Sequence, residues 1–139
     1  MTNSMDQSKM MPGESLLRLG WDAFWETQLR KGDRSRYALA RVTGTRKNSF
    51  VVSDGEMERR VTVSGSLIYR ILDLYPVVGD WVLLKDAVIT EVLPRKNAIS
   101  RGAAGARGKQ DETAREAQVI AANIDTVLIV CGMDRDFNV

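Results

Sequence analysis

The order of short segments along the chain predicts a mainly β fold, a five-stranded OB-fold barrel preceded by a helix. Three runs have a two-residue period and are rich in Val, Thr and aromatics: YALARVTGTR, NSFVVSDGE and MERRVTVSG. A compact helical segment, SLIYRILDLYPVVG, follows, and then come two more runs, DWVLLKD and AVITEVL. Three strands, a short helix and two strands are the order of the OB-fold. An SH3-like barrel is the alternative, and the helical segment favours the OB-fold.

The turns between these strands are marked by their residues. Lys47-Asn48 separates the first two runs, Ser53-Asp54-Gly55 is a strong hairpin signal before the third, and a turn near Asp86 joins the last two. The sequence therefore predicts a three-stranded meander followed, after the helical segment, by a final hairpin.

A helix is predicted from Ser15 to about Lys31, ahead of the barrel. Its apolar positions have helical spacing and form one aromatic-rich stripe: Leu17, Trp21, Phe24, Trp25 and Leu29. Gly20 within it costs about 1 kcal/mol relative to Ala, so the helix needs to pack on the barrel to be stable. Trp81, in the fourth strand, is expected in the core.

The chain divides into four predicted parts. Residues 1–14 form a polar, disordered leader, residues 15–94 the OB-fold domain, residues 95–117 a flexible basic connector, and residues 118–139 the start of another domain. Thr126 to Val130 has the pattern of a buried parallel strand, which needs neighbours on both sides. This strand either pairs upstream or opens a domain that the sequence does not contain. Cys131 beside it is expected to be a buried, inert thiol.

No catalytic or metal site is predicted for this chain. It has no histidine and one cysteine, which excludes an imidazole triad and a cysteine-rich zinc cluster. AAGARGKQ fails the phosphate-loop pattern, because Ala103 and Gln110 stand where a glycine and a hydroxyl residue are needed. The chain as given is therefore not expected to be an enzyme. It also lacks an apolar run of about 18 residues and a signal peptide, so a cytoplasmic location without membrane contact is expected.

Positive charge is unevenly distributed along the chain. The net charge is only +2, yet residues 30–60 hold nine basic residues against four acidic ones. A barrel wall with such loops would suit phosphate backbones, with Tyr37, Phe50 and Tyr69 as candidates for stacking on bases. An ordinary solvated face with core aromatics is the alternative. The candidate nucleic-acid-binding residues are Arg34, Arg36, Arg41, Arg46, Lys47, Arg59, Arg60, Arg95, Lys96, Arg101, Arg107 and Lys109.

Several stretches resemble one protein family. They are VVGDWV at 77–82, ITEVLPRKN at 89–97 with Ser100-Arg101, QVIAANID at 118–125, and the later DFN at 136–138. Leu19-Gly20-Trp21 and Arg41-Val42 look like the beginning of the same family. With these motifs, residues 16 to 139 resemble the ribosome small-subunit-dependent GTPase A family, RsgA, also called EngC.

The resemblance implies a domain order and a function. Members have an N-terminal OB domain that contacts 16S rRNA, a circularly permuted GTPase domain and a C-terminal zinc domain, and they bind the 30S subunit late in its maturation. Thr126 to Val130 would then be the first strand of a truncated GTPase domain. The guanine-recognition motif, phosphate loop, D-x-x-G switch and zinc ligands are missing from this sequence. GTP, Mg and Zn are accordingly expected in the full-length parent, and no cofactor in this chain.

The resulting hypothesis is an rRNA-contacting OB domain of a permuted GTPase that acts in late small-subunit maturation. Two alternatives stay open: an intramolecular module that regulates the GTPase domain, and a free-standing OB protein that binds single-stranded nucleic acid. An exposed apolar strand at 126–130 would also promote self-association.

Overall fold

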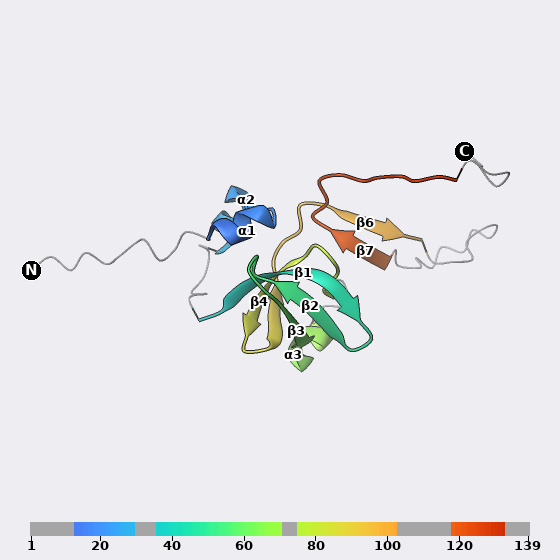
Figure 1. Ribbon diagram of the computed structural model, residues 1–139. Helices are drawn as coiled ribbons and strands as arrows, with labels where there is room; N and C mark the ends of the chain where they lie inside the picture. The colour runs from blue at the N-terminus through green and yellow to red at the C-terminus, as the bar shows by residue number, and fades with distance from the viewer. Residues whose placement is uncertain (1–12, 30–35, 71–74, 103–117, 133–139) are drawn as a thin grey trace, which may run out of the picture.

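The computed structural model describes residues 13–29, 36–70, 75–102 and 118–132 (Figure 1). The helices are α1 (Glu14–Arg18), α2 (Ala23–Leu29) and α3 (Gly65–Arg70). The strands are β1 (Ala38–Arg46), β2 (Ser49–Ser53), β3 (Glu58–Val63), β4 (Trp81–Lys85), β5 (Val88–Val92), β6 (Ala98–Arg101) and β7 (Gln118–Ala122). Apart from Gly13 and Glu14, the expected leader lies outside the described residues.

Five strands close into a barrel in the order β1-β2-β3-β5-β4, with β4 pairing back onto β1. All neighbours are antiparallel except β3 and β5, which run parallel, and α3 lies between β3 and β4 in the chain. This is the topology of the OB-fold, so the predicted fold class is confirmed. In Figure 1, α3 lies at one end of the barrel, and α1, α2 and the β6–β7 hairpin lie at the other.

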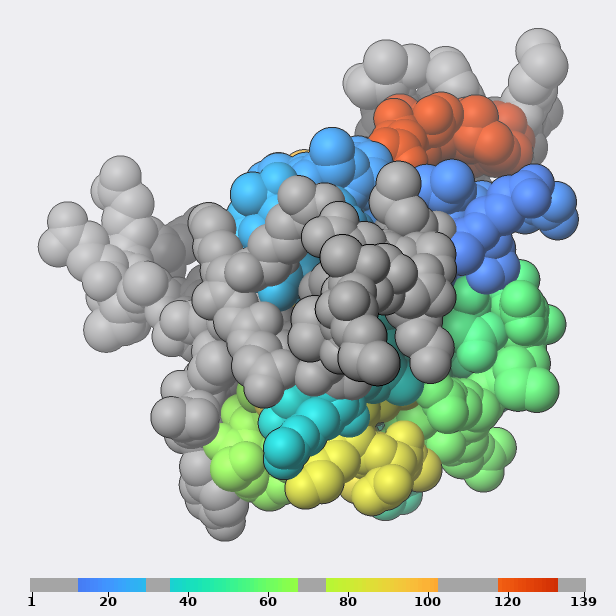
Figure 2. Space-filling view, turned by 90° about the vertical axis from the view of Figure 1, so that its left-hand side faces the viewer, coloured from blue at the N-terminus to red at the C-terminus, as the bar shows by residue number. Residues whose placement is uncertain are grey.

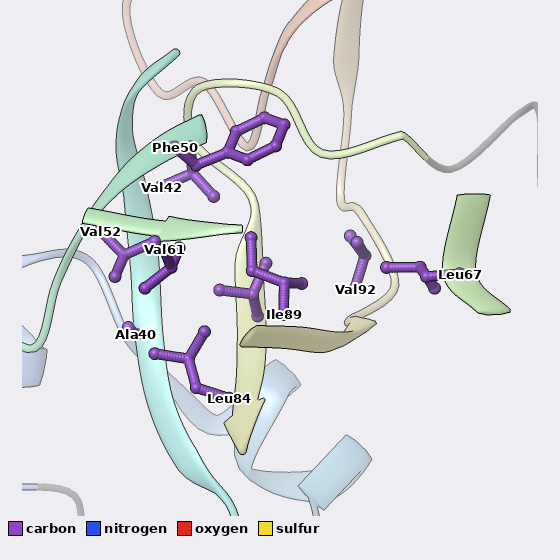
Figure 3. Close-up of a cluster of buried hydrophobic side chains, with 10 residues drawn as sticks. Ala40, Val42, Phe50, Val52, Val61, Leu67, Leu84, Ile89 and Val92 are labelled. Atoms are coloured by element: carbon purple, nitrogen blue, oxygen red, sulfur yellow. The ribbon is translucent and has the colours of Figure 1, made fainter. Parts of the chain in front are cut away.

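The barrel interior is filled by side chains at alternate positions of the strands (Figure 3). The cluster comprises Ala40, Val42, Phe50, Val52, Val61, Leu67, Val82, Leu84, Ile89 and Val92. Leu67 comes from α3 and lies next to Val92, so the helix covers one end of the interior. Phe50 is only 2% exposed, which makes its predicted stacking on a base wrong, because its ring faces the core.

A second apolar cluster lies on the outside of β4. Trp81 and Leu83 point away from the interior and pack with Trp21, Trp25 and Leu93. The Trp21 and Trp81 rings meet edge to face, with centroids 4.9 Å apart. Trp81 is fully buried, as the sequence predicted, and β4 is covered on both faces.

The single helix predicted from Ser15 to Lys31 is wrong, because two helices occupy this region. Gly20 has φ +91°, Trp21 N–H donates to Leu16 O and Gly20 N–H donates to Leu17 O, which is a Schellman ending for α1. The break lets Trp21 and Trp25 reach Trp81, while Leu17 stays 54% exposed.

Helix α1 lies against the β2–β3 turn, as the space-filling view shows (Figure 2). Gly55 in that turn has φ +92°, and a Cβ there would come within 2.2 Å of Ser15 O. Glycine is therefore required at this position both by backbone conformation and by the close approach of α1.

The strand expected at Thr126 to Val130 is absent, and a strand forms earlier, at β7. Among the described residues no strand pairs with residues 126–130, so they gain no ladder of hydrogen bonds. Leu128 and Val130 are 85% and 92% exposed. Cys131 is exposed as well, so the expected buried thiol is a wrong prediction. β7 instead pairs antiparallel with β6, which occupies part of the expected connector.

Candidate nucleic-acid interface

Four exposed basic side chains lie on the β1–β2 hairpin and on β3, and those of the consecutive residues Arg59 and Arg60 point to opposite sides of the strand. Arg46 and Lys47 lie at the tip of the β1–β2 hairpin, where Arg46 pairs with Ser49. Arg59 and Arg60 lie on β3, opposite Val52 and Val51 of β2. The surface of β2 and β3, with the β1–β2 and β4–β5 loops, is where OB-folds bind oligonucleotides. We call Arg46, Lys47, Arg59 and Arg60 the basic face.

The β4–β5 turn closes this surface on its other side. Thr62 N–H of β3 donates to Ala87 O at 3.0 Å, which holds the turn beside β3. Asp86 in the turn has φ 55°, a left-handed conformation that aspartate tolerates. The turn predicted near Asp86 is thereby confirmed.

The basic face keeps its charges available. Within the described residues, no ion pair to Arg46, Lys47, Arg59 or Arg60 is formed. Two nearby carboxylates are engaged by other groups. Backbone N–H groups of Met57 and Glu56 lower the pKa of Asp54, with a smaller contribution from the charge of Arg59, and Glu58 accepts the Thr43 hydroxyl at 2.9 Å.

Arg41, a predicted nucleic-acid contact, instead points into the protein. Its guanidinium donates to three backbone carbonyls: Gly79 O at 3.1 Å, Asn123 O at 2.8 Å and Leu19 O. It also lies 5.6 Å from the centre of the Trp81 ring. Burial lowers the pKa of Arg41, partly offset by the charges of Asp125 and Asp80.

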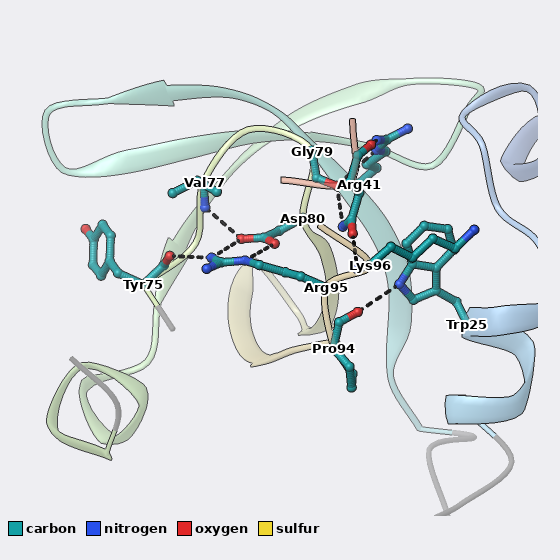
Figure 4. A network of polar contacts seen from close by, with 10 residues as sticks. Trp25, Arg41, Tyr75, Val77, Gly79, Asp80, Pro94, Arg95 and Lys96 are labelled. Carbon is teal, nitrogen blue, oxygen red and sulfur yellow. Dashed lines mark hydrogen bonds and ion pairs between the residues drawn. The ribbon is translucent and has the colours of Figure 1, made fainter. Parts of the chain in front are cut away.

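Arg95 is also used internally (Figure 4). Its Nε and Nη2 donate to both carboxylate oxygens of Asp80, at 2.8 and 2.7 Å, and Nη2 donates to Tyr75 O as well. The Asp80 side chain is fully buried and that of Arg95 is 12% exposed. Asp80 also accepts the Val77 N–H at 2.9 Å, so this bidentate pair braces the loop before β4.

Lys96 is held by the N-terminal helices. Its ammonium lies 4.4 Å from the centre of the Trp25 ring and forms an ion pair with Asp22. That hydrogen bond lowers the pKa of Asp22. Nearby, Trp25 Nε1–H donates to Pro94 O at 3.1 Å. Residues 94–96 are thus attached to α2 rather than forming the first part of a free connector.

The remaining candidates are spread over the molecule. Arg101 on β6 donates to the Gln118 side chain, and Arg36 is exposed just before β1. Tyr37 is 39% exposed. Arg34, Arg107 and Lys109, and the side chain of Tyr69, lie outside what the structure describes.

Sequence reasoning missed the polar residues that hold these arginines. Asp80, Asn97 and Asn123 were not singled out for a structural role, although Asp80 and Asn123 are buried. Asn123 has φ 53°, and asparagine is the residue other than glycine that most readily adopts this conformation. The signal in the sequence for this left-handed position was an asparagine directly after an apolar strand.

Two classes of site are not found in the described part of the chain. No group of three or more His, Cys, Asp or Glu side chains there could hold a metal ion. No helix there is long and apolar enough to cross a membrane.

Comparison with curated proteins places the chain beside one family, although no family model matches it. Over 61 residues it is 59% identical to the small ribosomal subunit biogenesis GTPase RsgA of Xanthomonas oryzae pv. oryzae strain PXO99A. Over a stretch of the same length it is 57% identical to RsgA of Xanthomonas campestris pv. campestris strain B100. The chain resembles the RsgA family. The resemblance seen in the sequence motifs is therefore confirmed.

The match to RsgA covers 44% of this chain and 15% of each relative's length. Among solved structures, that of YloQ, a circularly permuted GTPase, aligns with a TM-score of 0.36 and 18% identity. This alignment covers 48% of the present chain and 26% of YloQ. The OB-fold assignment rests on the strand order described above.

Proposed function

We propose that this chain carries the rRNA-contacting OB domain of a circularly permuted GTPase that acts in the cytoplasm, late in maturation of the small ribosomal subunit. The observation that carries the proposal is the basic face. Its four cationic side chains are exposed, belong to the elements with which OB barrels bind oligonucleotides, and have no ion-pair partner among the described residues. The similarity to the small ribosomal subunit biogenesis GTPase RsgA supports the small ribosomal subunit as the partner, and we propose 16S rRNA as the component contacted.

The expected mode of binding is electrostatic. Arg46 and Lys47, on a projecting hairpin, and Arg59 and Arg60, on the barrel wall, would neutralise phosphates and release counterions. Most described aromatic rings are unavailable for stacking on bases, since Trp21, Trp25, Trp81 and Phe50 are buried. A free-standing binder of single strands depends on such stacking, so this alternative is the less favoured one.

GTP hydrolysis belongs, in this proposal, to the full-length parent. Residues 118–132 would be the entry to its GTPase domain, and GTP, Mg and Zn would be bound by parts of the parent outside this chain. The described residues offer no metal-binding cluster, and the chain contains no phosphate-loop motif. In this proposal the residues of this chain contribute recognition and positioning.

The salt dependence of binding to purified small subunits tests the proposal. We expect the logarithm of the affinity to fall linearly with the logarithm of salt concentration. Each phosphate contact contributes about 0.7 to 0.9 to the magnitude of this slope. Changing Arg46, Lys47, Arg59 and Arg60 all to Glu should therefore reduce that magnitude by about 3. Arg18→Glu is a control, because Arg18 is exposed on α1 and pairs only with Glu14 among the described residues.

Other results would favour the intramolecular alternative. If the chain does not bind small subunits, or binds with a slope that the four substitutions leave unchanged, the rRNA proposal is wrong. A module that only regulates the GTPase domain would instead alter nucleotide turnover when the barrel is removed from the longer protein.

We also propose self-association of the chain through residues 127–130. These four apolar side chains are 58 to 92% exposed, which makes them available to pair with a second copy. Sedimentation should show concentration-dependent association that Leu128→Glu and Val130→Glu together abolish. A monomer over a wide concentration range would contradict this proposal.

A further inference from the structure

We propose that Arg41, Gly79, Asn97 and Asn123 form a joint that fixes the direction of the β6–β7 hairpin relative to the barrel. The joint would make the barrel and the residues that follow β7 move together as one rigid unit. This inference concerns the conformation of the chain and does not depend on RNA binding.

Arg41 connects three parts of the molecule. It lies on β1, and its guanidinium donates to Gly79 O before β4, to Leu19 O after α1 and to Asn123 O after β7. An arginine side chain presents its donors in a rigid, planar arrangement, so it fixes the relative directions of the groups that it binds. The barrel, the N-terminal helices and the hairpin are thus joined at one side chain.

Asn123 makes the hairpin side of the joint. Its Nδ2 donates to Gly79 O at 3.0 Å, and its Oδ1 accepts the Lys96 N–H at 2.8 Å. Asn123 N–H donates to Asn97 O, while the Asn97 amide makes two bonds to the backbone of Ile124, at 2.7 and 3.0 Å. Because Asn123 is only 5% exposed, its bond to Gly79 O is shielded from competing water, whereas the two bonds between Asn97 and Ile124 are exposed.

Gly79 provides the close approach between the two parts. Its φ is +96°, and a Cβ there would lie 1.9 Å from Ala122 O. Beside it, Ala122 N–H donates to Val78 O at 2.9 Å, within a parallel bridge between Val78 and Ala121. The end of β7 is therefore in direct backbone contact with the loop that leads into β4.

Apolar packing contributes little to holding the hairpin in place. All four residues of β6 are exposed, and Ala122 is the buried residue of β7. Directional hydrogen bonds consequently set the angle between hairpin and barrel. Losing them should free the hairpin without opening the barrel, whose interior is a separate cluster.

The angle can be measured by pulsed electron paramagnetic resonance between two spin labels. Exposed Lys85 and Ser100 are changed to Cys for labelling, one on the barrel and one on β6, in a Cys131→Ser background. The doubly labelled protein without further substitutions should give a single narrow distance peak. Arg41→Met and Asn123→Ala should each lose that peak in favour of a broad distribution. The controls Arg60→Met and Asn48→Ala, which alter exposed residues of the same types, should keep it.

Hydrogen exchange distinguishes a joint from a general structural role. In Asn123→Ala the Ala122 amide should lose about tenfold or more of its protection while the Val82 amide keeps its own. The proposal is overturned if both variants retain the narrow peak, or if barrel amides lose protection together with Ala122. Should Arg41→Met fail to fold, Asn123→Ala decides, since that side chain lies outside the barrel.

Discussion

Arginine side chains occur in two regions of this molecule that differ in their surroundings. On the basic face, Arg59 and Arg60 extend from β3 into solvent. At the end of the barrel near β6 and β7, Arg41 and Arg95 are surrounded by carbonyls and the buried carboxylate of Asp80. The role of each guanidinium therefore depends on the partner available to it. Where the protein supplies oxygens the arginine stabilises the fold, and where it does not the arginine can bind an external anion.

The largest expected effect comes from breaking the Asp80–Arg95 pair. Asp80→Ala should lower the free energy of unfolding by about 3–5 kcal/mol, because it leaves a mostly buried guanidinium without its counter-charge. Urea unfolding followed by tryptophan fluorescence measures this. The control Glu56→Ala removes an exposed acid and should change stability by no more than about 0.5 kcal/mol.

A double variant sharpens this result. Replacing both partners, Asp80→Ala with Arg95→Met, should be less destabilising than Asp80→Ala alone, because no unpaired buried charge remains. If the double variant is the less stable one, the pair does not act through charge compensation.

Arg41 and Arg60 should show opposite behaviour. Arg41→Gln should lower the free energy of unfolding by about 1.5–3 kcal/mol through lost charge-assisted hydrogen bonds, without changing the salt slope of RNA binding. Arg60→Gln should leave stability unchanged and reduce the slope by about 0.7 to 0.9. Measuring both quantities on both variants tests the comparison directly. A loss of slope in a correctly folded Arg41→Gln would contradict it.

Two glycines test the close approach at the joint. Gly79→Ala should destabilise the protein by about 1–3 kcal/mol, because its φ of +96° is unfavourable for alanine, and the added Cβ would meet Ala122 O. Gly44→Ala is the matched control, since its Cβ would have ordinary contacts of 3.6 Å with Val51. Equal stability losses in thermal unfolding would mean that the contact with β7 is not important.

The smallest expected effect is a dependence of the free energy of unfolding on pH, which comes from the contact between Asp22 and Lys96. The hydrogen bond from Lys96 lowers the pKa of Asp22 below 3.8, so the folded state binds fewer protons there than the unfolded state. The contribution of Asp22 to stability is therefore present above pH 3.8 and disappears as the pH falls through the lowered pKa. Asp22→Asn should flatten the dependence of the free energy of unfolding on pH in this range. Identical curves of stability against pH for Asp22→Asn and the unsubstituted chain would exclude the Asp22–Lys96 contact in solution.

Local patterns were sufficient for the barrel. Alternation along β1 and β2 predicts which residues face the interior, and Val42 and Val52 are buried there. The helix prediction was wrong at Gly20, because the helical spacing of the apolar residues around it does not reveal that Gly20 has a left-handed backbone conformation. The apolar run at 126–130 was predicted as a strand, but a strand needs a hydrogen-bonded neighbour, and the described residues provide none.

The candidate site was predicted less well than the fold. The sequence pattern places Arg41, Arg46 and Arg60 in one basic group, yet Arg41 faces inward and makes three bonds to carbonyls. The bonds that hold Arg41 connect it to residues 19, 79 and 123. Contacts between residues so far apart in the sequence cannot be predicted from the local pattern of charge.

Local sequence patterns were sufficient for the five barrel strands, their order along the chain and the number of positive charges, because alternation, turn residues and charge are properties of neighbouring positions. The tertiary structure alone decided which cations are free. Whether a guanidinium meets Asp80, the Gly79 carbonyl or solvent depends on contacts between distant segments, and those contacts exist only when the barrel, the helices and the β6–β7 hairpin are assembled.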